Sequence, residues 1–349
     1  MRIAIVNDVP LAREALRRAV VTVPDFEVAW LAADGDEAIE KTRADRPDLI
    51  LMDLIMPRVD GVEATRRIMA ETPCPILVVT ATVSGNMGRV YEAMGLGALD
   101  AVDTPSFDPR EGTLGTSPLL EKIRTISRLI GRPSRVPIAT PAAPPFDEGN
   151  PHFPLIAIGA STGGPAALAR ILNKLPDTEE AAVVIVQHVD EAFSRGLAEH
   201  LTKETGREVE LIVPGTVPLP GRLYLAGTND HVILDDRLRF RYVAEPSTLY
   251  YRPSVDVFFA SIAGRWPVRG SAALLTGMGR DGALGLKALR EAGWATIAQD
   301  EATCIVYGMP RAAAEIGAAE QILPLGQIAR ALADGITSRN ARARGASPR

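Results

Sequence analysis

Residues 49–61 read LILMDLIMPRVDG, and this stretch decides the fold of the first half of the chain. Its four apolar residues, Leu49–Met52, are followed directly by Asp53, which is typical of a buried parallel strand that ends at a polar site. Similar short strand-like runs lie at 2–6, 27–31, 76–79 and 98–102, with helix-period segments at 11–20 and 36–43. This alternation predicts an α/β domain with a doubly wound, flavodoxin-like parallel sheet.

A second series of strands and helices begins at Pro154 and predicts another doubly wound, Rossmann-like parallel sheet. Strands are expected at 155–158, 182–186, 272–275 and 295–298, and helices after Gly164, at 192–205, after Asp281 and at 325–333. A β-rich insertion is expected from Val209 to about Tyr242, with turns at Pro220-Gly221 and Asp235-Asp236. The predicted parts are a first domain at 1–105, a helix and Pro-rich linker at 106–152, a second domain at 153–338 and a flexible tail at 339–349.

Composition excludes several classes of protein. The 349 residues are 46% hydrophobic and 23% charged with a formal net charge of −5, and no long basic stripe or basic recognition helix is present. A nucleic-acid partner, and with it a transcription factor, is therefore not expected. The two distant cysteines, Cys74 and Cys304, predict neither a disulfide framework nor a zinc site. Without a signal peptide or an apolar run of about 18 residues, the chain is expected to be cytoplasmic, with no direct membrane insertion.

Two acidic residues follow neighbouring strands of the first predicted sheet. Asp8 follows the first strand and Asp53 the third, and these strands flank the point where the strand order reverses. The two carboxylates are therefore expected in one crevice, where their oxygens suit Mg²⁺. Such an ion would neutralise charge while an Asp53 oxygen attacks a phosphoryl donor. Taken singly, each acid is more often a turn-former after a strand.

These residues, with Met56-Pro57 and Asp60-Gly61, resemble the receiver domain of two-component response regulators over about residues 1–105. The resemblance implies that Asp53 is the phosphoacceptor, Asp8 a metal ligand and Thr80 the switch hydroxyl. The sequence departs from the family at two positions: Asn7 replaces the first of two adjacent acids, and Thr104 replaces a lysine. Both changes remove charge, so Mg²⁺ affinity and phosphorylation efficiency are expected to be lower.

Three separated residues of the second domain predict nucleophilic catalysis. Ser161 lies in GASTGG (159–164) after a strand and before a helix, a turn that lifts its side chain to the sheet edge. His188 ends the next strand and Asp281 follows a later one, so all three are expected at one edge. Ser161 would attack, His188 would take its proton, and Asp281 would orient the imidazole. The backbone amides of Thr162 and Met278 are candidates for an oxyanion hole.

The main alternative is that GASTGG cradles a phosphate, which would make the second domain a nucleotide- or phosphate-binding module without hydrolase activity. A dinucleotide site needs an acid at the end of the next strand, where this chain has Gln187 and His188, although Asp190 follows closely. The other histidines, His152, His200 and His231, have no such placement. An active-site serine probe would distinguish the alternatives, since only the hydrolase should be labelled at Ser161.

The motifs GASTGG, Gln187-His188 and TGMGRDG (276–282) together resemble the catalytic domain of chemotaxis protein-glutamate methylesterases over about residues 153–338. The N-terminal MRIAIVNDVPLAREALRR and GALDAVDTP (97–105) are most similar to the methylesterase of Wsp-type surface-sensing systems. The resemblance implies hydrolysis of γ-glutamyl methyl esters on the cytoplasmic domain of a chemoreceptor, with glutamine deamidation by the same acyl chemistry and no cofactor for that step. It implies a chemotaxis-type histidine kinase as phosphodonor.

Overall fold

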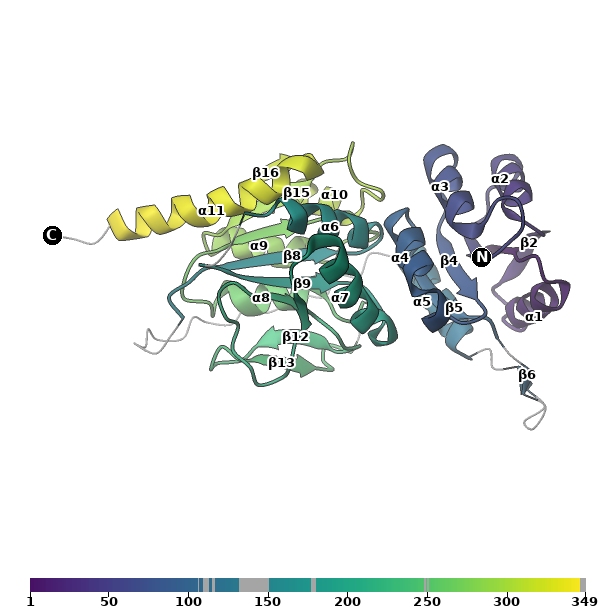
Figure 1. The fold of residues 1–349 in the computed structure, drawn as a ribbon, viewed down its shortest axis with the longest axis horizontal. Helices are drawn as coiled ribbons and strands as arrows, with labels where there is room; N and C mark the ends of the chain where they lie inside the picture. Colours follow the sequence, from purple (N-terminus) through teal and green to yellow (C-terminus); the bar gives the residue numbers. More distant parts are fainter. Residues whose placement is uncertain are drawn as a thin grey trace. The chain divides into compact units, whose positions relative to one another are not determined.

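The computed structural model describes residues 1–105, 107–108, 113–114, 117–131, 151–176, 180–247, 249 and 251–345. The chain forms two compact units, Met1–Arg132 and Pro133–Arg349, and each is described by itself. Figure 1 labels most of their helices and strands. Among the described residues, no helix is both long enough and apolar enough to span a bilayer.

The first unit is built on a parallel sheet with the strand order β2-β1-β3-β4-β5. Every residue of β3 and β4 is buried, as expected where both faces of a parallel sheet are covered. The flavodoxin-like order predicted from 49–61 is confirmed. The elements are β1 (Arg2–Val6), α1 (Pro10–Val21), β2 (Glu27–Ala32), α2 (Gly35–Ala44), β3 (Leu49–Met52), α3 (Gly61–Glu71), β4 (Ile76–Thr80), the 3-10 turn η1 (Ser84–Asn86), α4 (Met87–Gly95), β5 (Asp100–Asp103), β6 (Phe107–Asp108), β7 (Thr113–Leu114) and α5 (Ser117–Gly131).

Helix α5 belongs to the first unit and not to a linker, so the predicted boundary at residue 105 is too early. Its apolar residues Leu119, Ile123 and Ile126 are buried in the core formed by the first sheet. Lys122 Nζ also pairs with Asp100 Oδ2 of β5 at 2.6 Å. The helix has an apolar face that needs a core to cover it. The predicted Pro-rich linker, residues 133–151, lies outside the described residues except for Pro151.

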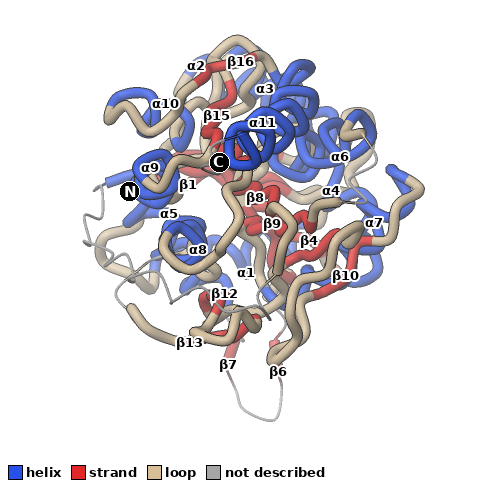
Figure 2. The backbone as a smooth tube through the Cα atoms, turned by 90° about the vertical axis from the view of Figure 1, so that its left-hand side faces the viewer, coloured by secondary structure: helices blue, strands red, loops and turns tan. Residues whose placement is uncertain are grey.

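The second unit is built on a seven-stranded parallel sheet with the order β10-β11-β9-β8-β14-β15-β16. Its middle strands β8 and β9 lie side by side in Figure 2. The elements are β8 (Leu155–Ala160), α6 (Gly164–Lys174), β9 (Ala182–Gln187), α7 (Glu191–Thr205), β10 (Val209–Leu211), β11 (Leu223–Leu225), β12 (His231–Leu234), β13 (Phe240–Val243), α8 (Val255–Ala263), β14 (Ser271–Leu274), α9 (Ala283–Glu291), β15 (Ala295–Gln299), α10 (Met309–Glu315), β16 (Gln321–Leu323) and α11 (Leu325–Gly345).

The segment predicted as a β-rich insertion divides into two parts. Strands β10 and β11 extend the main sheet, because β11 pairs in parallel with β9 and β10 pairs with β11. Only β12 and β13 form a separate antiparallel pair. The insertion is therefore smaller than predicted, since short buried strands look alike in sequence whether they extend one sheet or start another.

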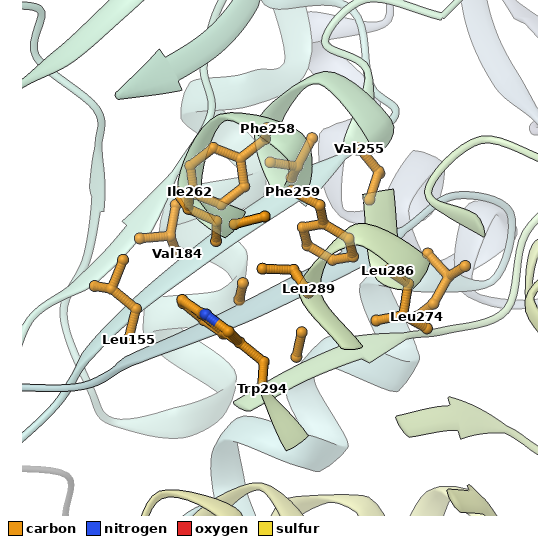
Figure 3. Packing of buried hydrophobic residues seen from close by; sticks show 14 of the residues in the cluster. Leu155, Val184, Val255, Phe258, Phe259, Ile262, Leu274, Leu286, Leu289 and Trp294 are labelled. Atoms are coloured by element: carbon orange, nitrogen blue, oxygen red, sulfur yellow. The ribbon is translucent and has the colours of Figure 1, made fainter. Parts of the chain in front are cut away.

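Helix α8 packs at the centre of the second core, as the close view in Figure 3 shows. All nine of its residues are buried, and Phe258, Phe259 and Ile262 join Leu155, Leu286 and Trp294 in one cluster. This helix was not predicted, because a helix that is buried on every side has no polar face to reveal its period. Its burial fixes the helix N-terminus, which lies at the site described below.

Residues 339–345, predicted as part of a flexible tail, continue helix α11 to Gly345. The segment ArgAsnAlaArgAlaArg (339–344) consists mostly of good helix formers, and basic residues are favourable at a helix C-terminus. Residues 339–345 are therefore helical, the flexibility predicted for the tail stays a prediction, and the remaining 346–349 lie outside the described part.

Candidate active site and phosphoacceptor site

Asp53 lies in a buried polar group at the ends of β1 and β3. Asn7 Nδ2 donates to Asp53 Oδ2 at 2.9 Å, and the Leu54 amide donates to Oδ1 at 2.7 Å. Burial, together with the negative charge of Asp8, raises the pKa of Asp53 to about 6, although the amides of Ile55 and Leu54 oppose this rise. The structure thus brings Asp8 and Asp53 together at the edge predicted for them.

The negative charge of Asp8 and Asp53 favours binding of a hard cation. The negative charge of Asp8 helps to raise the pKa of Asp53, and a bound cation would relieve the same repulsion. Asp8 and Asp53 would hold Mg²⁺ as oxygen ligands. Asn7 contributes no charge here and uses its Oδ1 to accept from the Val9 amide at 2.9 Å. Within the described residues, no cluster of three or more His, Cys, Asp or Glu is arranged to hold a metal, so this group offers two carboxylates.

Thr80 and Thr104 meet at the ends of β4 and β5. Thr80 is buried, and its hydroxyl accepts from Asn86 Nδ2 at 3.3 Å. The Thr104 amide donates to the Thr80 carbonyl at 2.8 Å. Thr104 therefore lies at the sheet edge where the receiver family carries its lysine, and it brings no cation there.

We expect the double variant Asn7→Asp, Thr104→Lys to accept a phosphoryl group from a small acyl phosphate faster than the unaltered chain, by about tenfold or more, because charged hydrogen bonds contribute about 1.5–3 kcal/mol. The gain should require Mg²⁺, since Asp at position 7 would otherwise place a third negative charge against Asp53. The rate is measured as phosphorylated chain by intact mass, with Asp53→Asn as the unphosphorylated control. Equal rates for the two chains with Mg²⁺ would show that these positions do not limit the reaction.

Ser161 occupies a tight turn between β8 and α6. Its amide donates to the Thr276 carbonyl at 3.0 Å, and the Gly164 amide donates to its carbonyl at 2.7 Å. Gly163 has a φ of 78° as the residue before α6, a left-handed conformation that favours glycine. Gly277 passes so close that a Cβ there would lie 2.6 Å from Ser161 Cβ. The turn therefore holds Ser161 at the carboxyl edge of the sheet.

His188 follows the neighbouring strand β9, and its amide donates to the Ala160 carbonyl at 3.0 Å. Its ring Nε2 lies 2.7 Å from Asp281 Oδ2. The Tyr251 ring stacks on the imidazole with centroids 3.9 Å apart and an angle of 12° between the planes. His188 Nδ1 is buried and makes no hydrogen bond in the described part of the chain. Since Nε2 faces Asp281, Nδ1 is the nitrogen left to accept a proton.

Gln187 ties the backbones of these two residues together. Its buried Nε2 donates to the Ser161 carbonyl at 2.9 Å and to the His188 carbonyl at 3.0 Å. The side chain thus fixes the spacing of the two strand ends. No hydrogen bond between the Ser161 hydroxyl and His188 is found among the described residues.

Asp281 is held by the first turn of α8. Its Oδ1 accepts from the Ser254 hydroxyl at 2.7 Å, and its Oδ2 accepts from the Val255 amide at 2.6 Å. Burial alone would raise the pKa of Asp281, but the hydrogen bonds from His188, Ser254 and Val255 outweigh it and lower the pKa. The carboxylate is therefore kept ionised although it is buried.

Asp281 and Asp256 each accept a hydrogen bond from the N-terminal turn of a neighbouring helix, α8 for Asp281 and α9 for Asp256. Asp281 precedes α9 but accepts from amides at the start of α8, whereas Asp256 lies in α8 and accepts from the Gly285 amide of α9 at 2.7 Å. Each carboxylate lies at the positive end of the other's helix. Burial and the charge of Asp281 raise the pKa of Asp256 well above its usual range. This reciprocal capping locks the two helix N-termini against each other beside His188.

The two candidate oxyanion-hole residues are Thr162, which follows Ser161 in the chain, and Met278, which follows Gly277 beside Ser161. The Thr162 carbonyl accepts from the Thr276 hydroxyl at 2.9 Å. The Met278 carbonyl accepts from the Tyr251 hydroxyl at 3.0 Å. Within the described residues, neither amide donates a hydrogen bond. The Thr162 and Met278 amides therefore stay candidates for binding an oxyanion.

Several supporting residues were not predicted. Ser254 could have been found as an N-cap before the apolar run VDVFFASIA (255–263), whereas Tyr251, Asp256 and His231 carry no local signal. Asp190, which kept a dinucleotide site open as an alternative, accepts from the Ala192 amide at 3.0 Å and caps α7. The Asp190 carboxylate thus serves as the N-cap of α7 at this strand end.

The fold and these two sites define a class of protein, a receiver-type phosphoacceptor domain followed by an α/β serine hydrolase. Family models agree: CheB methylesterase matches residues 156–332, and response regulator receiver domain matches residues 3–111. The chain is 52% identical over 96% of its length, and 99% of the relative's, to protein-glutamate methylesterase/protein-glutamine glutaminase 3 of Pseudomonas aeruginosa. It is 54% identical to such a protein of Cupriavidus metallidurans, over 94% of this chain and 96% of that one.

The CheB methylesterase catalytic domain of Thermotoga maritima, a crystal structure, resembles this chain with a TM-score of 0.50 and 32% identity, covering 52% of this chain and 98% of that one. The chain belongs to the CheB methylesterase family. The fold class predicted from the sequence and the resemblance to this family are thereby confirmed. The names of these relatives do not specify a surface-sensing system, so that subgroup stays a prediction.

Proposed function

We propose that this chain is a phosphorylation-regulated esterase that hydrolyses γ-glutamyl methyl esters on chemoreceptors, with Ser161, His188 and Asp281 as its catalytic residues. The observation that carries the proposal is the buried 2.7 Å pair between His188 Nε2 and Asp281 Oδ2, at the strand end next to the Ser161 turn. An ionised acid that fixes one ring nitrogen leaves the other free to accept a proton, as acyl transfer by serine requires.

The reaction proceeds in two steps. His188 Nδ1 takes the Ser161 proton while Oγ attacks the ester carbonyl, and the oxyanion is stabilised by the amides of Thr162 and Met278. The C–O bond to the methoxy group breaks, His188 returns the proton, and methanol leaves an acyl-serine. Water then attacks that ester with His188 again as base, releasing the glutamate and Ser161. A glutamine side chain would give the same acyl-serine with loss of ammonia, so deamidation is part of the proposal.

In this proposal the esterase acts in chemosensory adaptation in the cytoplasm, and a chemotaxis-type histidine kinase is its phosphodonor. Asp53 would take the phosphoryl group, and Mg²⁺ held by Asp8 and Asp53 would neutralise charge during that transfer. Thr80 would act as the switch hydroxyl. Ester hydrolysis needs no cofactor in this scheme, because Ser161, His188 and Asp281 supply the nucleophile, base and orienting acid.

Methanol release from methylated receptor membranes tests the proposal, with and without a small phosphodonor. Release that rises with the phosphodonor is expected. A serine-directed fluorophosphonate probe identifies the residue by peptide mass, and labelling at Ser161 is expected. Tight nucleotide binding without labelling or methanol release would contradict the proposal and favour a phosphate-binding module.

We expect a chain that begins at Pro151 to demethylate receptors faster than the unphosphorylated full-length chain. The switch domain precedes the hydrolase, and tethering raises its effective concentration near Ser161, so a weak inhibitory interface suffices. Phosphorylation would relieve inhibition only if the two switch states bind the hydrolase differently. Initial rates of methanol release are compared, with Asp53→Asn as the full-length control. Equal rates would instead favour a receiver that only docks the enzyme to a partner.

A further inference from the structure

His231 is a buried histidine outside the predicted triad whose ring makes two directed hydrogen bonds. It begins β12 and has no exposed surface. Its Nδ1 accepts from the Ser254 amide at 3.1 Å, and its Nε2 lies 3.3 Å from the Pro246 carbonyl. A ring nitrogen that accepts from an amide carries no proton, so Nε2 carries it and donates to the carbonyl. The two partners therefore specify a neutral ring of one tautomer.

Ser254 connects this ring to the acid of the triad. It is the fully buried N-cap of α8, and its hydroxyl accepts from the Val257 amide at 3.3 Å while it donates to Asp281 Oδ1 at 2.7 Å. A buried amide at a helix start needs an acceptor from outside the helix. His231 supplies the acceptor for the Ser254 amide. The hydrogen bonds thus run from His231 through Ser254 and Asp281 to His188.

We infer that His231 is a positioning residue of the esterase, which holds Ser254 so that Asp281 presents Oδ2 to His188. The inference rests on the proposed triad and adds a residue from β12, outside the main sheet, to its support. His231 touches neither Ser161 nor His188 in any described hydrogen bond, so it acts through Ser254.

The charges around His231 agree with a neutral ring. Burial lowers its pKa, the hydrogen bond to the Pro246 carbonyl opposes this, and Arg252 lowers the pKa further. The acids Asp281, Asp230 and Glu245 also face the ring and favour its charged form. A doubly protonated ring would direct an N–H at the Ser254 amide and break the connection.

The test compares His231→Leu with His231→Asn in the full-length phosphorylated chain. Leu fills most of the volume of the ring without a polar atom, whereas Asn is smaller but keeps an acceptor at the position of Nδ1. For Leu we expect kcat to fall about 10- to 100-fold, by analogy with the loss found when partners that orient a metal-bound histidine are removed, with KM changed less than about twofold. Asn should keep kcat within about fivefold of the unaltered chain, because Ser254 keeps its partner.

The pH profile separates positioning from partial unfolding. A well-placed carboxylate stabilises the imidazolium, so a displaced Asp281 should move the acidic limb of kcat/KM to lower pH in the Leu variant. Unfolding of a fraction of the enzyme would scale kcat/KM equally at every pH. An unchanged kcat in Leu, or a loss in Leu and Asn alike with an unmoved acidic limb, would overturn the inference.

Ser254→Ala and Ser254→Thr test the same connection if His231→Leu does not fold. Ala removes the hydroxyl from Asp281 and should reproduce the kcat loss and the shifted limb, while Thr should restore both. Ala and Thr with equal kcat would overturn the inference. Ser161→Ala in the same assay distinguishes failure of the proposed function from failure of this inference. If Ser161→Ala stays active, the proposed function fails. If Ser161→Ala is inactive but the variants at positions 231 and 254 are as active as the unaltered chain, this inference alone fails.

Discussion

Ser161→Ala is expected to abolish methanol release while leaving the protein folded. Loss of a serine nucleophile that acts with a histidine lowers kcat by about 10⁶-fold in a well-studied protease, so at least about 10⁴-fold is expected here. The turn itself should survive, because the bonds that hold Ser161 are made by its amide to Thr276 and by its carbonyl to Gly164 and Gln187. None of them uses the hydroxyl.

Initial rates on methylated receptor membranes measure this effect, together with thermal unfolding and phosphorylation at Asp53 as tests of folding. Ser271→Ala is a matched control, since Ser271 is a fully buried serine on the neighbouring strand β14 whose hydroxyl has no described partner. It should keep normal activity. Methanol release by purified Ser161→Ala at the rate of Ser271→Ala would remove Ser161 from the mechanism.

Asp281→Asn is expected to lower kcat by about 10⁴-fold, the loss known for the corresponding change in a serine protease, where it stabilises the wrong imidazole tautomer. Here the carboxylate accepts from His188, the Ser254 hydroxyl and the Val255 amide. An amide at this position replaces one acceptor oxygen by an NH₂ group, which would face donors. The change should also destabilise the first turn of α8, by about 1–3 kcal/mol for a buried unsatisfied donor.

Kinetics must therefore be measured at a temperature where the variant is folded, as judged by circular dichroism. Asp256→Asn is the comparison, because it also removes a buried acid from the paired helix ends but keeps an acceptor for the Gly285 amide. It should retain much more activity than Asp281→Asn. A loss below about tenfold for Asp281→Asn would mean that Asp281 is not the orienting acid.

The residues at strand ends could be predicted from sequence because parallel strands bring their carboxyl ends to one edge. Asp53, Ser161 and His188 stand at the ends of buried apolar runs, and Asp281 follows such a run after a short loop, so each has a readable signal. The strand β3 and the order of the first sheet followed from the same pattern. Resemblance to known motifs then separated these residues from ordinary turn-formers.

The supporting residues could not be predicted because their roles depend on contacts between distant segments. His231 accepts from Ser254, which lies 23 positions later, and Asp256 caps a helix 29 positions away. Helix α8 has no polar face, so its period is absent from the sequence. The apolar face of α5 was visible, but the core that covers it was not. Local patterns identify an element more readily than its partner.

The hydrogen bonds that Asp281 accepts from α8 and Asp256 accepts from α9 have a consequence for protein synthesis. Ser161 and His188 leave the ribosome before Asp281, and Asp281 is placed only when α9 has formed and docked its N-terminus against α8. A growing chain therefore carries a nucleophile and a base without the acid that orients them. Hydrolytic competence should then appear only after α9 has docked against α8.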